Sequence, residues 1–166
     1  MEEHEDKHAC LDAWFVIEVM KAKMHKRSKM PEIDVLKIYD KIKDYWDPYL
    51  PQPVVGEVVN YLLNQKDLGS EEFMSALAKL TDLLREVKME PLSWDAIEIA
   101  KKLGEDEKWL KPTDAIIVGM ALADEECTWL VTVDRVMRES LAITRVDKEL
   151  VENGSRRHPL KVGLNH

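Results

Sequence analysis

Residues 112 to 136 constrain the fold more than any other stretch of this chain. They read as a helix of small and apolar residues that begins near one acid, Asp114, followed by an apolar run that ends on another, Asp134. Thr113 is a good helix N-cap, which would place Asp114 in the first turn. Trp129 to Val133 is short and rich in β-branched residues, as in a strand buried on both faces. Such a strand predicts an open α/β sheet, in which ligands bind at the carboxyl edge.

Length and hydropathy predict one soluble domain. The chain has 166 residues, and 45% of them are hydrophobic, which is enough for a sizeable core. No apolar run approaches the roughly 18 residues of a membrane span, and no signal peptide is visible, so we expect a cytoplasmic protein without a membrane partner. We expect a charged leader at residues 1–8, a domain at 9–150, and a basic polar tail at 151–166.

The net charge of −8 argues against binding nucleic acid through overall electrostatics. Two basic clusters still offer local surfaces for phosphate. The alternative for each cluster is a solvated helix end or a loose tail. The clusters are Lys21, Lys23, His25, Lys26, Arg27 and Lys29, and Arg156, Arg157, His158 and Lys161.

Histidine and cysteine give no metal site in this sequence. His4 and His8 complete an H-E-x-x-H pattern, but the segment is terminal, polar and followed by a strand, whereas the zinc-protease motif needs a packed helix. Cys10 and Cys127 lack paired spacing, so reduced thiols in the core are expected.

The remaining segments alternate between strand and helix patterns. This alternation predicts a parallel sheet of about four to five strands with helices on both faces, a three-layer α/β/α fold. We expect strands at 8–11, 87–90, 129–133 and 142–146, and a loop at 47–53. We expect one helix to begin after Asp12, one at Pro53 and one after the N-cap Thr113. Further helices are expected at 31–46, at 70–85, at 94–103 with Gly104 as C-cap, and at 135–141.

Four acids are expected at the carboxyl edge of this sheet. Asp12 and Asp134 follow strands, Asp114 begins a helix on the same edge, and Glu57 lies near the apolar face of a helix. Crowded carboxylates repel one another unless cations neutralise them, and oxygen ligands favour Mg²⁺ or Mn²⁺. Taken singly, each aspartate is equally an ordinary helix cap.

In order and spacing, these pieces resemble the PIN-domain nucleases, in particular the VapC-type toxins of prokaryotic toxin–antitoxin pairs. The resemblance extends from about residue 9 to 146 and implies a PIN-like fold. It rests on Leu11-Asp12, on Val55-Gly56-Glu57-Val58, on Thr113-Asp114-Ala115, and on Leu130-Val131-Thr132-Val133-Asp134.

The resemblance implies a metal-dependent ribonuclease that leaves a 5′-phosphate and a 3′-hydroxyl. Asp12, Glu57, Asp114 and Asp134 would be its catalytic acids and would hold one or two Mg²⁺ or Mn²⁺ ions, while Thr132 would orient a carboxylate or a water. It also implies RNA as substrate, an antitoxin that covers the acidic notch, and a homodimer. Lys26, Arg27, Arg156 and Arg157 are the candidate RNA contacts.

The chain departs from the family pattern at two places. Ala13 and Trp14 follow the first aspartate, where the family often has small hydroxyl or amide residues, and Val136 replaces a frequent further acid. A non-catalytic PIN-like RNA-binding or assembly module is therefore the alternative function. A phosphotransfer protein of doubly wound fold is disfavoured, because haloacid-type phosphatases need a second aspartate at position 14.

Overall fold

The computed structural model describes residues 6–28, 30–65 and 69–166. It contains a five-stranded parallel sheet of order β3-β2-β1-β4-β5. The strands are β1 (His8–Leu11), β2 (Asp47–Pro51), β3 (Lys88–Glu90), β4 (Cys127–Val131) and β5 (Lys161–Gly163). The predicted parallel sheet with helices on both faces is confirmed.

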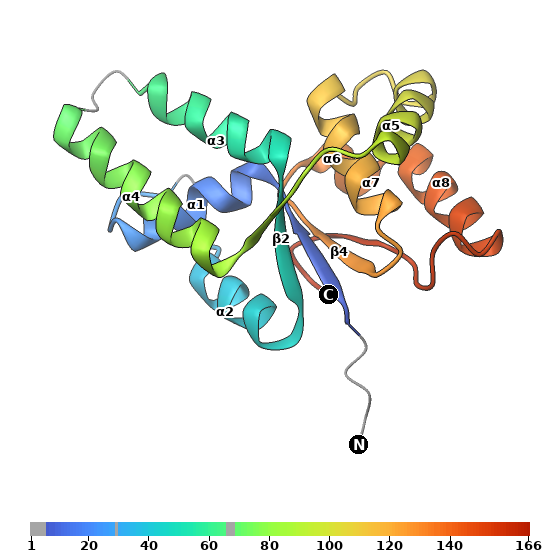
Figure 1. The fold of residues 1–166 in the computed structure, drawn as a ribbon, viewed down its shortest axis with the longest axis horizontal. Helices are drawn as coiled ribbons and strands as arrows, with labels where there is room; N and C mark the ends of the chain where they lie inside the picture. The colour runs from blue at the N-terminus through green and yellow to red at the C-terminus, as the bar shows by residue number, and fades with distance from the viewer. Residues whose placement is uncertain (1–5, 29, 66–68) are drawn as a thin grey trace.

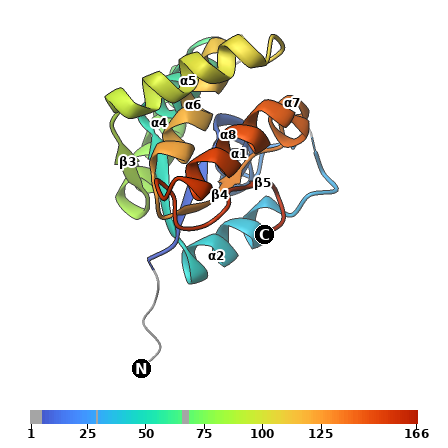
Figure 2. The ribbon, with the colours of Figure 1, turned by 90° about the vertical axis from the view of Figure 1, so that its right-hand side faces the viewer.

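Figure 1 shows the sheet between two layers of helices, and Figure 2 gives the view turned by 90°. The first four helices form one layer: α1 (Ala13–Lys23), α2 (Val35–Tyr45), α3 (Gln52–Leu63) and α4 (Ser70–Glu86). The last four form the other: α5 (Trp94–Asp106), α6 (Pro112–Ala123), α7 (Arg135–Glu139) and α8 (Leu141–Glu152). No helix in the described part of the chain is long and apolar enough to cross a membrane.

The strand order reverses at the centre of the sheet: β2 and β3 are added on one side of β1, and β4 and β5 on the other. β1 pairs with β2 on one side and with β4 on the other, so the connections that follow β1 and β4 leave the same edge of the sheet. In doubly wound sheets, a crevice forms at such a switch point. Asp12 directly follows β1, and Asp134 lies three residues beyond β4, so both acids reach this crevice.

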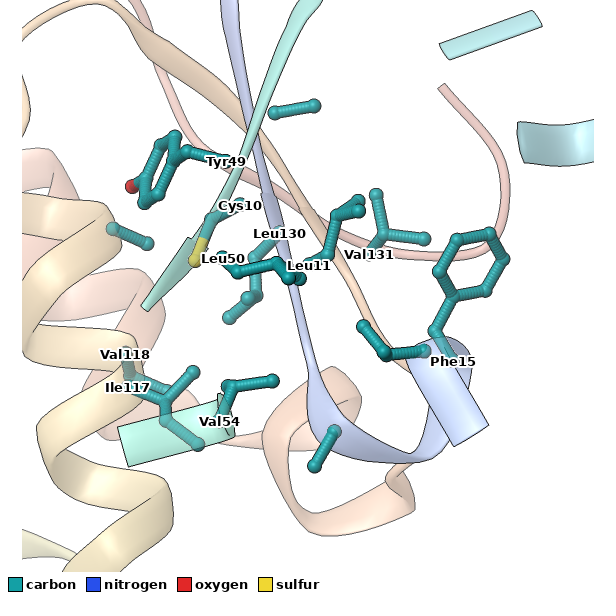
Figure 3. Close-up of a cluster of buried hydrophobic side chains, with 14 of the residues drawn as sticks. Cys10, Leu11, Phe15, Tyr49, Leu50, Val54, Ile117, Val118, Leu130 and Val131 are labelled. Carbon is teal, nitrogen blue, oxygen red and sulfur yellow. The ribbon is translucent and has the colours of Figure 1, made fainter. Parts of the chain in front are cut away.

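The core fills the space between the central strands and the helices. Every residue of β4 is buried, and Figure 3 shows apolar side chains of β1, β2, β4 and α6 gathered together. Cys10 and Cys127 are free, buried thiols, as expected. Helix α6 lies directly against α5 because Gly119 has no side chain: a Cβ there would come within 2.4 Å of the Ala96 carbonyl oxygen.

The segment expected to be a loop, residues 47–53, contains strand β2 instead. Pro48 pairs only with β1, and Pro51 pairs only with β3, while Tyr49 pairs with both. Because the two neighbours are staggered, each proline lies where the strand has a single partner, and the missing N–H groups are tolerated.

The segment expected to be a fourth strand, residues 142–146, lies inside helix α8. Ala142, Ile143 and Val146 are buried, whereas Arg145 is exposed, which is helical spacing. The Ser140 hydroxyl caps this helix by accepting from the N–H of Ile143.

The residues beyond 150 are part of the domain and not a loose tail. Helix α8 continues to Glu152, and residues 161–163 form β5, the last strand of the sheet. The Trp129 indole donates a 2.9 Å hydrogen bond to the Gly163 carbonyl, which fixes β5 to the core. The segment expected to be a basic polar tail therefore contributes a strand to the sheet.

Other element ends differ from expectation by a few residues. Helix α6 begins at Pro112 with Lys111 as its N-cap residue, so Thr113 lies inside the helix. Helix α5 runs through Gly104 to Asp106, and α2 begins at Val35, where the Asp34 side chain caps it. His4 lies outside the described residues.

Candidate active site

Asp12 is a buried acid held in place from two directions. Its side chain is 3% exposed. Its Oδ1 accepts a 2.8 Å hydrogen bond from the Ala13 N–H at the start of α1, and its Oδ2 accepts a 2.6 Å hydrogen bond from the Thr132 hydroxyl. Asp12 thus lies at the end of β1, and the first residue of α1 and the residue after β4 fix the orientation of its carboxylate.

Thr132 connects the two central aspartates. Besides donating to Asp12, its hydroxyl accepts a 3.0 Å hydrogen bond from the backbone N–H of Asp134. The Asp134 carboxylate caps α7 by accepting from the N–H of Met137. The Thr132 hydroxyl thus lies between Asp12 and Asp134, and it supports Asp12 although no small polar residue follows the first aspartate.

Asp114 and Glu57 reach the same place from the two helical layers. Asp114 lies in the first turn of α6, and Glu57 lies in the middle of α3; both are partly buried. Together with Asp12 and Asp134 they border one cleft of about 420 Å³. The remaining residues around it are Ala13, Trp14, Ile17, Asn60, Tyr61, Asn64, Gln65 and Lys111.

Burial and neighbouring carboxylates raise the pKa values of three acids at the cleft. Burial, followed by the charges of Asp12 and Asp114, raises the pKa of Glu57 to about 7. Burial, followed by the charges of Asp12 and Asp134, raises the pKa of Asp114 to about 6. Burial also raises the pKa of Asp12, against the lowering effect of its hydrogen bonds to Thr132 and Ala13. The charged forms are thus disfavoured together, and a nearby cation would relieve the repulsion.

The donor chemistry of the cleft fits a hard divalent cation. Its acidic lining is carboxylate alone, and the described residues that border it include no histidine or cysteine, as Mg²⁺ or Mn²⁺ prefers and Zn²⁺ does not. Within residues 6–28, 30–65 and 69–166, no three such side chains are already gathered as a complete ligand set for one ion. The ligands would have to converge on the ion.

Two positions around the cleft depart from the usual family pattern. Trp14 exposes 39% of its surface at the rim, beside the start of α1. Val136 is exposed on α7 and contributes no further carboxylate. Lys111, which the sequence did not single out, is the basic residue among the described residues that border the cleft, and its charge lowers the pKa values of Glu57 and Asp114.

The first basic cluster is largely paired with acids at the surface. Lys26 lies 3.5 Å from Glu72, and Arg27 is exposed. Lys21 pairs with Glu18 at 3.2 Å and contributes to the rim of the neighbouring apolar groove rather than to the cleft. Lys29 lies outside the described residues.

The expected role of Arg156 as an RNA contact is wrong. Arg156 is only 2% exposed, and its Nε donates to Asp147 at 3.0 Å. Its Nη atoms donate to the backbone carbonyls of Ala121, Leu122, Asp124, Cys127 and His158. All its polar atoms are therefore used inside the fold. Arg157 is exposed, but it lies 3.2 Å from Glu126.

Comparison with known proteins identifies the family. Residues 9–149 match the family described as PIN domain. A sequence search of curated proteins finds no match. Two solved structures share the fold with a TM-score of 0.64: VapBC2 from Rickettsia felis bound to a DNA fragment from their promoter, 13% identical, and FitAcB from Neisseria gonorrhoeae, 16% identical.

The likeness to these structures extends over most of each chain. It covers 81% of this chain and 94% of the Rickettsia felis chain, and 93% of this chain and 96% of the Neisseria gonorrhoeae chain. PAE2754 from Pyrobaculum aerophilum is also similar, with a TM-score of 0.53, 17% identity, and coverage of 92% of this chain and 98% of that one. Since the PIN domain match spans most of the sequence, the chain belongs to the PIN domain family.

Proposed function

We propose that this protein is a metal-dependent endoribonuclease that hydrolyses RNA phosphodiester bonds with Mg²⁺ or Mn²⁺. The observation that carries the proposal is the cleft bordered by Asp12, Glu57, Asp114 and Asp134, in which burial and the neighbouring carboxylates raise the pKa values of Glu57 and Asp114. Membership of a family of nucleases supports it. The acids come from both helical layers and from the segments that follow both central strands.

The four acids, Thr132 and Lys111 have different roles in the proposed chemistry. Asp12, Asp114, Asp134 and Glu57 would hold the cation, which when bound neutralises phosphate charge and activates water for in-line attack. Thr132 holds the Asp12 carboxylate in one orientation through its 2.6 Å hydrogen bond. Lys111 adds a positive charge at the rim, where it would attract the RNA backbone.

We also propose that the protein is the toxin of a toxin–antitoxin pair. The solved structures that share its fold include complexes named VapBC and FitAB. An antitoxin would cover the acidic cleft, and a basic side chain among the carboxylates would replace the cation. An apolar groove of about 60 Å³ between α1, α3 and α4 adjoins the cleft and includes Met20, Val58 and Leu62.

A homodimer that joins two clefts into one groove belongs to the same proposal and is tested by light scattering of the purified protein. A mass of one chain, about 19.2 kDa, at working concentration would contradict it.

The nuclease is tested by incubating purified protein with a mixed RNA pool in Mg²⁺, in Mn²⁺ or in EDTA. We expect cutting that requires the metal and that Asp114→Asn abolishes, while Asp82→Asn, an exposed acid on α4, cuts like the wild type. The absence of cutting in a folded sample that metal also fails to stabilise would overturn the proposal. It would favour the non-catalytic RNA-binding or assembly module.

A further inference from the structure

One wall of the acidic cleft carries aromatic and amide side chains instead of acids. Helix α3 turns one face to the cleft, because Asn60 and Tyr61 lie three and four residues after Glu57. The C-cap residue Asn64 and the following Gln65 continue this side of the cleft beyond the helix. At a rise of 1.5 Å per residue, Asn64 lies about 10 Å along the helix from Glu57. This wall therefore begins at the proposed metal site and leads away from it.

The aromatic part of the wall is Trp14 packed on Tyr61. The two ring centroids lie 6.3 Å apart in an edge-to-face arrangement of 63°. The Lys21 ammonium lies 5.5 Å from the Tyr61 centroid and also pairs with Glu18, so Tyr61 is supported from the groove side. Trp14 is two residues from Asp12, borders the cleft and exposes 39% of its surface, so part of an indole ring lies beside the acids.

The amide part of the wall presents one donor and one acceptor. The Asn64 amide nitrogen donates to the Asn60 backbone carbonyl at 2.9 Å and to its side-chain oxygen at 3.1 Å. These bonds restrain both side chains, and both residues border the cleft, while the Asn60 amide nitrogen and the Asn64 side-chain oxygen take no part in these two bonds. A nucleobase offers a flat π face and an edge of alternating donors and acceptors, which this wall matches.

We infer that Trp14, Asn60 and Asn64 form a subsite for one unpaired nucleobase beside the scissile phosphate. The inference rests on the proposed ribonuclease function and names its substrate class, a single-stranded or looped RNA. A base inside a duplex is stacked on both faces and paired along its edge, so it cannot present either to this wall. The base stacks on Trp14, and the two asparagines bond to its edge.

The test measures binding apart from cleavage, by fluorescence anisotropy in the Asp114→Asn background, which does not cut. The probe is an end-labelled single-stranded RNA of about eight nucleotides, compared with its duplex. We expect Trp14→Leu to weaken binding of the single strand by about 5- to 100-fold and Trp14→Phe to retain most of it, because only the aromatic ring stacks. Trp94→Leu is the matched control, since Trp94 is 75% exposed on α5 and lies away from the cleft.

A series of strands, each lacking one base, locates the subsite. Removing the base that stacks on Trp14 should weaken binding of the RNA to the protein that retains Trp14. The same removal should cause little further loss of affinity for the Trp14→Leu variant. The comparison is a double-mutant cycle between the base and the ring. Asn60→Ala, at an exposed helical position, should change which base is preferred at that place. It also gives a second variant if Trp14→Leu lowers the unfolding temperature.

Equal binding by Trp14→Leu and Trp94→Leu would overturn the subsite, as would equal binding of single strand and duplex. Failure of the subsite is distinguishable from failure of the proposed function. If wild-type protein cuts RNA with metal and Trp14→Leu cuts the same bonds at the same rate, the nuclease stands and the subsite falls. If the wild type cuts nothing in Mg²⁺ or Mn²⁺, the nuclease falls whatever the binding measurements show.

Discussion

The Thr132 hydroxyl, directly after β4, is completely buried and donates a 2.6 Å hydrogen bond to Oδ2 of Asp12. The two residues are 120 positions apart in the chain. Their contact joins the carboxyl ends of β1 and β4, and the precision of the site depends on it.

Thr132→Val keeps the shape of this side chain and removes its hydroxyl. We expect a loss of about 1–3 kcal/mol in stability, because a buried carboxylate oxygen loses its donor, and a roughly 10- to 100-fold loss of metal affinity or activity. Thr132→Ser should recover most of both. Urea denaturation and RNA cleavage measure the two effects, and a Val variant with wild-type cleavage would contradict the orienting role.

The metal-free protein should become less stable as the pH rises from about 4 to about 7. The pKa of Glu57 rises from 4.5 to about 7 on folding and that of Asp114 from 3.8 to about 6, so the folded state binds more protons than the unfolded state in this range. Stability is therefore present at low pH and lost as these groups ionise. Thermal unfolding in EDTA at several pH values measures this, and Glu57→Gln should flatten the upper part of the curve. A rise in stability up to pH 7 that Glu57→Gln leaves unchanged would speak against the coupling.

Divalent cations should raise the unfolding temperature. A cation at 100 times its dissociation constant adds about 2.7 kcal/mol to the free energy of unfolding, provided that it binds only the folded state. Calorimetry with Mg²⁺ or Mn²⁺ measures this, and Asp114→Asn should remove the shift while Asp82→Asn retains it. The same shift in both variants would place the cation elsewhere.

Arg156→Met should destabilise the fold by about 3–5 kcal/mol, because it leaves Asp147 buried with no positive partner. Arg156→Lys should not restore stability, since an ammonium cannot reproduce the bonds of the guanidinium to several carbonyls. Arg157→Ala is the matched control and should be close to neutral. Denaturant unfolding of the three variants decides the matter; a stable Arg156→Met protein would show that these contacts are dispensable.

Lys26→Ala combined with Arg27→Ala should weaken RNA binding by a similar factor for every sequence, because contacts to the phosphate backbone carry no sequence information. Affinity for several unrelated strands at a fixed salt concentration measures this. Unchanged affinity would exclude this cluster and leave Lys111 as the basic residue to test next.

The sequence predicted the centre of the fold better than its edges. β1, β4 and the acids after them are recognisable because a buried central strand needs a continuous apolar run, and Asp12 and Asp134 mark where each run stops. Pro48 and Pro51 made the segment of β2 look like a loop. The staggered pairing that allows prolines in this strand depends on the neighbouring strands, which the local sequence does not reveal. β5 has three residues and pairs on one side, which is too little for a periodic signal.

Long-range contacts explain the remaining differences at the site. Arg156 reads as a member of a surface cluster because its neighbours Arg157 and His158 are polar, while its partners lie on α6, β4 and α8. The residues on the same side as Glu57 could have been predicted, since Asn60, Tyr61 and Asn64 follow Glu57 at helical spacing. What the spacing could not reveal is that Trp14 of α1 packs on that face.

The position of β5 determines when during synthesis the active site can form. The backbone N–H of Thr132 donates to the Gly163 carbonyl, so the residue that orients Asp12 is itself held by the strand that is translated after all the others described here. A ribosome produces the acids of the cleft, from Asp12 to Asp134, well before residues 161–163 emerge. The nascent chain therefore carries every carboxylate while it still lacks the strand that holds Thr132. If the proposed nuclease is correct, cutting should appear only after residues 161–163 have left the ribosome.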